Sequence, residues 1–386
     1  MKVCAVTTWP PHKDGVALYS AELYTHLAKL VDLKIIANIP EEPSEYEYPK
    51  LKEGTVLRCW KRGSFTYPLT IFRSTLKEGP NIVHLQHGWL LYGNFISSTL
   101  FLILLLFFRL SRKPCVVTMH MVIRKDAHLH DNALVNLLAR MAVLFMSSFI
   151  IKISDKIIVH NCLMKKVFQR EYALQEESKI VVIPHGVKNA SGKPSISRRG
   201  KRTWILSLGF VRESKGIEHL VKAFEKFLEV YPDARLIIAG GRHAHDKTDH
   251  IGKYKHLLTS NLSKYVFFTD FIDEKSLDRL IWKSDMIVLL SLDRYYVEAS
   301  GVLARIADYG KPIICSRVPK FETELKNREN CIMITPGDSE ELAQAFISLT
   351  LNTHLRESIK KNLRRKFKDR HWDAVAKQHF ILYRTI

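Results

Sequence analysis

The chain has 386 residues, 46% of them hydrophobic and 25% charged, which is typical of a globular protein and excludes a disordered or collagen-like chain. This length favours two domains over a single core. The formal net charge of +20 predicts an anionic partner: a nucleotide, a phosphorylated substrate, nucleic acid or a membrane surface.

Six cysteines are scattered along the chain without a C-x-x-C spacing. Several lie in apolar runs such as "PCVVT" and "PIICS", where a reduced thiol packs as a small hydrophobic group. They favour a cytoplasmic location over a disulfide framework or a zinc site. The N-terminal "MKVCAVTTWPP" has an apolar segment that is too short for a secretory signal and is more typical of a first strand.

The first half alternates short apolar runs with longer amphipathic segments, beginning with the helical "GVALYSAELYTHLAKL". Such alternation is typical of a parallel sheet covered by helices on both faces. It predicts an N-terminal Rossmann-like domain over residues 1–187. The predicted strands are 1–8, 32–39, 81–87, 115–120 and 155–161, with "IPHGV" closing the set.

Residues 88–108, "GWLLYGNFISSTLFLILLLFF", carry no charge and are nearly long enough to cross a bilayer, which takes about 20 residues. The strand-like runs on both sides are expected to be neighbours in one sheet, and a membrane crossing would put them on opposite sides of the bilayer. We therefore expect a crossover helix rather than a transmembrane helix. Such a helix is either deeply buried, which we favour, or partly immersed in a lipid surface. The basic residues Arg109, Arg112 and Lys113 are compatible with membrane contact.

Residues 188–202 are polar, basic and rich in Ser and Gly, as a linker is. A second strand and helix series follows over 203–368, and residues 369–386 form a C-terminal helix that we expect to pack back on the first domain. The predicted fold class is therefore α/β, with two Rossmann-like domains facing across a cleft.

Two loops of the second series carry candidate anion-binding groups. In "LSLGFVRESKGIEHL" a strand ends at Gly209, and Arg212 and Lys215 precede a helix that begins near residue 216. Two cations and a helix N-terminus suit a diphosphate, although a solvated charged loop explains this segment equally well.

In "VEASGVLAR" a helix begins near Ser300, so that the amides of Gly301, Val302 and Leu303 face out of its first turn. Glu298 just ahead could accept a hydrogen bond from a sugar hydroxyl. Taken alone, a carboxylate that merely favours the helix dipole is the simpler interpretation.

The motifs and their order resemble the GT-B glycosyltransferases of family 4, also called group 1. The resemblance runs almost end to end through "PPHKDGVALYSAELYTHLAKL", "VVTMH", "SDKIIVHN", "KIVVIPHGV", "LGFVRESKGIEHLVKAF", "EASGVLARIADYGKPII" and "HWDAVAKQHFILY". It implies an enzyme that moves a sugar from a nucleotide-sugar donor to a hydroxyl acceptor.

The resemblance also implies residue roles. Lys215 is similar to the donor-phosphate lysine, with Arg212 sharing that task from a shifted position, because Phe210 stands where the family usually has arginine. His120 is similar to a histidine that holds the donor sugar and the leaving group. Gly15 is similar to one glycine of a double-glycine loop, whose first position here is Asp14.

Family members commonly have two glutamates with seven residues between them, the first contacting the transferred sugar and the second the ribose. By resemblance Glu298 takes the first role, with a one-residue shift, and Arg305 stands at the second. Arginine has donors only and cannot accept from ribose hydroxyls. Either Asp308 or Glu322 holds the ribose, or donor affinity is weak, or the site is degraded.

No D-x-D motif is present, so we expect no metal and no resident cofactor, with the nucleotide diphosphate sugar as co-substrate. Lys215, Arg212 and helix dipoles would neutralise the leaving diphosphate. The resemblance implies retention at the anomeric carbon. The acceptor expected is a soluble glycan or a lipid-linked one, and an anionic membrane surface is a further expected partner.

Two rival hypotheses stay open. A non-catalytic nucleotide or glycan binder could keep this fold after losing turnover, and Arg305 and Asp14 favour that rival. A nucleic-acid protein is disfavoured, because the Arg-rich segments lack interleaved aromatic residues. His84 and His87 are candidate acceptor contacts, and the loop with His243, His245 and His250 is a weak candidate for metal binding.

Overall fold

The structure is a computed structural model that describes residues 1–41, 51–52, 54–172, 177–190, 202–242 and 248–386. It divides into two compact units. Unit 1 contains Met1–Gly186, Tyr295–Ala299 and Trp372–Ile386, and unit 2 contains Val187–Arg294 and Ser300–His371. Most of the predicted linker, residues 191–201, lies outside the described part of the chain.

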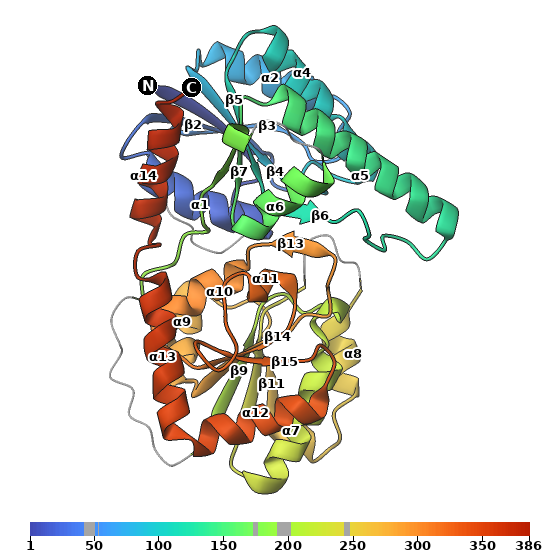
Figure 1. The fold of residues 1–386 in the computed structure, drawn as a ribbon, viewed down its shortest axis with the longest axis vertical. Helices are drawn as coiled ribbons and strands as arrows, with labels where there is room; N and C mark the ends of the chain where they lie inside the picture. The colour runs from blue at the N-terminus through green and yellow to red at the C-terminus, as the bar shows by residue number, and fades with distance from the viewer. Residues whose placement is uncertain (42–50, 53, 173–176, 191–201, 243–247) are drawn as a thin grey trace. The chain divides into compact units, whose positions relative to one another are not determined.

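Unit 1 is built on a parallel sheet with strand order β3-β2-β1-β4-β5-β7-β8 (Figure 1). The sequence pattern does not predict β3, a half-buried edge strand whose side chains lack a continuous apolar run. The strands are β1 (Lys2–Thr7), β2 (Asp32–Asn38), β3 (Val56–Trp60), β4 (Ile82–His87), β5 (Cys115–Met119), β7 (Lys156–Val159) and β8 (Ile180–Val182).

Helices cover both faces of this sheet, because alternate residues of each strand point to opposite sides. Val3 and Ala5 of β1 pack in one cluster with α1 and α14, whereas Cys4 and Val6 pack in the other with α2, α4, α5 and α6. The helices of unit 1 are α1 (Gly15–Leu27), α2 (Tyr67–Lys77), α3 (Phe95–Thr99), α4 (Phe101–Leu110), α5 (Ala133–Ile153), α6 (Cys162–Glu171) and α14 (Trp372–Tyr383).

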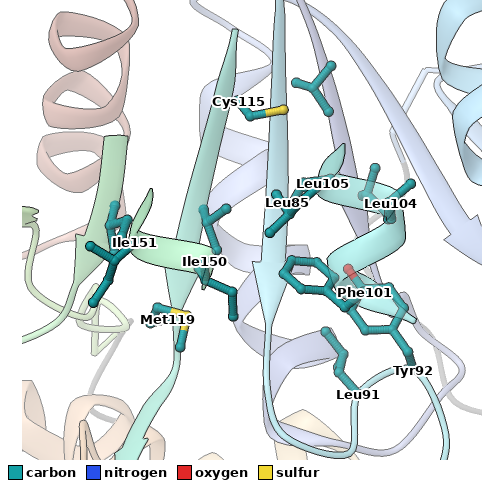
Figure 2. Packing of buried hydrophobic residues seen from close by; sticks show 14 of the residues in the cluster. Leu85, Leu91, Tyr92, Phe101, Leu104, Leu105, Cys115, Met119, Ile150 and Ile151 are labelled. Carbon is teal, nitrogen blue, oxygen red and sulfur yellow. The ribbon is translucent and has the colours of Figure 1, made fainter. Parts of the chain in front are cut away.

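The uncharged segment 88–108 forms two short helices, α3 and α4, rather than one crossover helix. Asn94 caps α3, and a break at Leu100 separates it from α4. Figure 2 shows Phe101, Leu104 and Leu105 of α4 beside Leu85 of β4, in the core that the sheet and helices share. The predicted burial is therefore correct for one face of α4, while its other face is exposed.

Unit 2 is built on a second parallel sheet, with order β11-β10-β9-β12-β14-β15. The strands are β9 (Trp204–Leu208), β10 (Arg235–Ala239), β11 (Val266–Phe268), β12 (Met286–Leu289), β14 (Ile313–Ser316) and β15 (Ile332–Ile334). Its helices are α7 (Ile217–Val230), α8 (His250–His256), α9 (Glu274–Lys283), α10 (Gly301–Ile306), α11 (Pro319–Glu322), α12 (Ser339–Leu351) and α13 (Thr353–Phe367). The predicted α/β class with two Rossmann-like units is confirmed.

The chain leaves unit 2 for one short strand. Residues Tyr295–Ala299 group with unit 1, where β13 (Tyr296–Glu298) pairs antiparallel with β6 (Met121–Ile123). The sequence pattern instead predicts a single domain over 203–368. A strand of three residues leaves no periodic pattern of its own, so its partner could not be read from the sequence.

Candidate functional site

A pocket in unit 2 lies at the carboxyl ends of the parallel strands, the edge where such sheets bind ligands. Its floor comes from the ends of β9, β10 and β12, and its walls come from the loop after β9 and the start of α10. The residues lining it are Ser207, Leu208, Gly209, Phe210, Lys215, Ile217, Ile238, Leu289, Leu290, Ser300, Val302 and Phe321.

Glycines allow three segments to approach closely at this pocket. Gly209 has φ +125°, and a Cβ on it would lie 3.3 Å from Val302. Gly240 has φ +141°, and a Cβ there would lie 2.1 Å from the carbonyl oxygen of Gly209. The Gly209 amide donates to Ala239 at 3.0 Å. Any side chain at residue 240 would therefore push the pocket loop away from β10.

Lys215 reaches the pocket from a single 3₁₀ turn, Glu213–Lys215, which Gly216 caps. Gly216 has φ +58°, a conformation that suits glycine, and α7 begins immediately after it. The lysine side chain is half-buried beside a helix N-terminus. Its position favours binding of an anionic group.

Arg212 precedes this turn and is not among the pocket-lining residues. Its Nε atom is buried and makes no hydrogen bond within the part of the chain that the structure describes. A buried guanidinium nitrogen without a hydrogen bond destabilises the protein unless a ligand accepts a hydrogen bond from it. The shared role with Lys215 stays a prediction.

The start of α10 supplies fewer donors than the sequence predicts. Ser300 caps the helix, and its hydroxyl accepts from the Leu303 amide at 3.2 Å. The Leu303 amide is thus already used, which leaves those of Gly301 and Val302 in the first turn. Ser300 and Val302 line the pocket, whereas Gly301 is exposed and Leu303 is buried.

Glu298 and His120 come together in unit 1 rather than in the pocket of unit 2. Glu298 of β13 lies opposite Met121 of β6, the residue that follows His120. The side-chain amide of Asn161 donates to the Glu298 carbonyl at 3.4 Å. Two segments about 180 residues apart in the sequence thereby pair Glu298 with Met121, and His120 lies directly before β6.

Both ring nitrogens of His120 have partners within unit 1. Nε2 lies 2.7 Å from Gln86 Oε1, and Nδ1 lies 3.3 Å from Nε2 of His160. Burial, together with the neighbouring imidazoles of His160 and His185, lowers the pKa of His120 well below its usual value. His120 is therefore neutral, and a ligand would have to displace one of these contacts. The sequence motifs did not indicate Gln86 and His160 as its partners.

Asp14 has a structural role at the start of α1, and the ligand contact that the family resemblance implies for Gly15 stays a prediction. Asp14 is buried and caps α1, accepting from the Ala17 amide at 2.6 Å and from the Thr8 hydroxyl at 3.2 Å. Burial raises the pKa of Asp14, but the contact with His12 and these hydrogen bonds outweigh it and lower the pKa. A Cβ at Gly15 would meet no atom of the described residues within 4 Å, so packing within the protein does not require a glycine there.

The charge of Arg305 is already paired within unit 2. Its guanidinium lies 2.7 Å from Glu274 and 2.9 Å from Asp278, both on α9. Lys188 joins the same two carboxylates, and the Tyr309 hydroxyl donates to Asp278. Burial raises the pKa of Glu274, but Arg305 and Lys188 outweigh it, so this pKa is lowered overall. Arg305 thus holds α9 against α10.

Arg305→Glu is expected to destabilise the protein by about 1–3 kcal/mol, because it would place a third carboxylate beside Glu274 and Asp278. Thermal unfolding measures this loss, and Arg305→Lys, which keeps the charge, is the control. Titration with nucleoside diphosphates should show no gain in affinity. A tighter-binding Arg305→Glu variant of unchanged stability would contradict this assignment.

The two proposed replacements for the ribose contact differ in their surroundings. Asp308 accepts from the Ala190 amide at 2.9 Å and so holds the chain where unit 2 begins. Glu322 is exposed and follows Phe321, which lines the pocket. Glu322 is therefore the better placed of the two.

His243 and His245 of the histidine loop lie outside the described residues, which omit 243–247. In the part of the chain that the structure covers, no group of three or more His, Cys, Asp or Glu residues could hold a metal ion. His84 and His87 are buried in β4, away from solvent.

Two family models match the chain in succession. "Glycosyltransferase Family 4" matches residues 13–190, and "Glycosyl transferases group 1" matches residues 191–366. The chain belongs to the family 4, group 1 glycosyltransferases. The boundary between the two matches falls near the junction of the two units, so each unit carries one of the family's sequence signatures.

Curated relatives of this glycosyltransferase chain include an uncharacterized glycosyltransferase of Methanocaldococcus jannaschii, 27% identical over 49% of the chain and 47% of the relative. Another is a phosphatidyl-myo-inositol mannosyltransferase of Mycobacterium leprae, 26% identical over 54% of each. The matched region thus spans about half the length of these relatives.

Solved structures share the whole fold. HepE of Anabaena, solved in complex with UDP-glucose, superposes with a TM-score of 0.73 at 12% identity and 100% coverage of both chains. Sucrose-phosphate synthase of Thermosynechococcus elongatus gives a TM-score of 0.74 at 16% identity, covering 100% of this chain and 98% of that one. At such low identity these likenesses establish the GT-B fold.

Proposed function

We propose that this protein transfers a sugar from a nucleotide diphosphate sugar to a hydroxyl acceptor, with retention at the anomeric carbon and without a metal ion. The observation that carries the proposal is the unit 2 pocket, where Gly209, Lys215 and Ser300 converge at the carboxyl edge of the sheet. The family assignment and the UDP-glucose bound by HepE support a diphosphate donor.

In the proposed reaction the bond between the anomeric carbon and the donor diphosphate breaks, and a bond to the acceptor oxygen forms on the same face of the sugar. The acceptor proton passes to an oxygen of the leaving diphosphate. Lys215, and Arg212 if it turns toward the ligand, would stabilise the negative charge that develops on that group. Glu322 would accept a hydrogen bond from the ribose.

We further propose a lipid or lipid-linked acceptor. The relative from Mycobacterium leprae is named for transfer to phosphatidyl-myo-inositol, and the net charge of +20 would hold the protein near an anionic lipid surface. A soluble glycan is the alternative acceptor.

A non-catalytic nucleotide binder is the second candidate, and a specific observation favours it. Arg305 replaces the family glutamate and is already engaged by Glu274 and Asp278, so the usual ribose contact is absent from α10. This rival predicts binding without turnover.

Purified protein incubated with a panel of nucleotide sugars, with and without chelator, distinguishes the two candidates. We expect slow donor hydrolysis, and faster transfer when membrane lipids are added, at rates that chelator leaves unchanged. Nucleotide binding without release of diphosphate would support the non-catalytic rival. Loss of activity on chelation would contradict the metal-independent reaction.

A further inference from the structure

Helix α5 exposes an apolar stripe to solvent, which is the reverse of the usual arrangement. Leu134, Leu137, Leu138, Met141 and Phe145 recur at helical spacing, and each side chain is between 52% and 65% exposed. The opposite face, with Val143, Met146 and Ile150, is buried against unit 1. At 1.5 Å per residue the exposed stripe is about 17 Å long.

Helix α4, which packs against α5, exposes a second stripe. Ile103, Leu106 and Leu110 follow one another at helical spacing and are exposed, Leu110 by 72%. Their neighbours Leu104, Leu105 and Phe108 are buried. Two adjacent helices thus each turn apolar side chains outward, which marks an interaction surface rather than scattered exposed residues.

Cations lie at one end of this pair of helices. Arg109 at the end of α4 meets Asp155, which follows α5, at 3.5 Å, so the two helices end side by side. Arg112 and Lys152 are exposed at the same end. The acidic residues near the other end of α5, Asp126 and Asp131, contact Arg124 and His128. Apolar stripes ending in cations are complementary to an anionic lipid interface.

The length of α5 decides how it could meet a membrane. Its 21 residues are long and apolar enough to cross a bilayer, yet 28% of its most apolar 18-residue stretch is buried in unit 1. Residues 143–151 could not leave the unit without emptying part of its core. The first half, residues 133–142, projects away from the sheet in Figure 1 and spans about 15 Å, half of the hydrocarbon thickness.

We propose that the α4–α5 surface, defined by Leu134, Leu137, Leu138, Met141, Phe145, Ile103, Leu106 and Leu110, lies in the interface of an anionic lipid bilayer. Helix α5 would lie along the membrane surface without crossing it, and Arg112 and Lys152 would meet lipid phosphates. This inference extends the proposed lipid acceptor but does not depend on it, because vesicle binding requires neither donor nor acceptor.

Flotation with vesicles tests the proposal. Wild-type protein should float with vesicles of phosphatidylcholine and phosphatidylglycerol at 7:3. We expect the double variant Leu138→Glu/Met141→Glu to bind about tenfold or more weakly. The matched control Val230→Glu/Leu351→Glu changes two exposed apolar residues of unit 2 by the same charge and should bind as wild type. Circular dichroism checks that each variant is folded.

A second variant isolates the charges. Arg112→Gln/Lys152→Gln should weaken binding to the anionic vesicles by about fivefold per residue, and high salt should abolish that difference. Wild-type protein that fails to bind vesicles, or an α5 double variant that binds normally, would overturn the proposal. So would a wild-type dimer that the α5 variant makes monomeric while no vesicle binding is seen, because the surface would then join two copies of this chain.

Discussion

Lys215→Ala is expected to lower kcat/KM for the nucleotide-sugar donor by about a hundredfold or more, the usual cost of removing one preorganised donor at a developing anion. Lysine supplies a compact charge with three donors, and hydrogen bonds from such a group to phosphate are stronger than neutral ones. Lys215 is half-buried at the pocket, which limits screening by water. Most of the loss should fall on kcat, because the charge on the leaving diphosphate grows in the transition state.

Steady-state rates with the best donor of the panel measure this effect. Lys215→Arg should recover part of the activity, since it keeps the charge. Lys222→Ala removes an exposed lysine from α7 of the same unit and should leave the rates unchanged. We expect thermal unfolding of Lys215→Ala to change by about 1 kcal/mol or less. Full activity of a folded Lys215→Ala protein would mean that the donor binds elsewhere.

Acid is expected to destabilise the protein near pH 5, because unit 1 holds six histidines whose pKa values are lowered, four of them buried and two, His120 and His185, half-buried. Burial lowers the pKa of His87 and His160 to about 3 and that of His185 and His379 to about 4, and those of His84 and His120 are lowered well below the usual range. The partners of His84 include the hydroxyls of Tyr24, Tyr383 and Thr118, none of which compensates a positive charge.

The direction of the effect follows from the depressed pKa values. Between pH 6.5 and the folded pKa the unfolded chain binds protons that the folded chain does not, so stability falls as the pH falls through this window. Each histidine contributes up to about 2 kcal/mol by pH 5. The four histidines whose pKa is lowered to about 3 or 4 would together remove several kcal/mol, a large part of the stability of a typical domain.

Urea unfolding at pH 8, 7, 6 and 5 measures how the free energy of unfolding depends on pH. The His87→Leu variant tests the contribution of a single buried histidine. His87 packs against Phe101 and Trp89, and its Nδ1 makes no hydrogen bond within the described residues. The free energy of unfolding of the leucine variant should fall less steeply as the pH is lowered, because unfolding then takes up about one proton fewer. The exposed His130→Leu substitution, also in unit 1, controls for the change in side chain. A stability independent of pH from 8 to 5 would contradict the prediction.

Several elements could be predicted from the sequence because their signals are local. The apolar runs of β1, β2, β4, β5 and β7 are largely buried on both faces, and continuous apolar runs of this length are typical of a parallel sheet. The loop from Gly209 to Gly216 follows one predicted strand and precedes a predicted helix, and α10 begins in the same way after another strand. The sequence could therefore predict that Lys215 and the start of α10 meet at one sheet edge.

The structure alone decided features that depend on a distant partner. Glu298 joins unit 1 because β13 pairs with β6, and no pattern within three residues can name a partner strand. Arg305 sits between Glu274 and Asp278, contacts set by how α9 packs on α10. The family resemblance makes Asp14 a substituted glycine, whereas its place is the cap of α1.

Helix α5 shows the limit most clearly. Its apolar spacing is the same whether the stripe faces a core or the solvent, because periodicity fixes that a helix has an apolar face and not what covers it. The sequence by itself therefore determined the two Rossmann-like units and the meeting of Lys215 with the start of α10 at the unit 2 pocket. Only the tertiary structure decided which side chains are already paired, which strand crosses between units and which apolar face is left outward, because each depends on elements far apart in the chain.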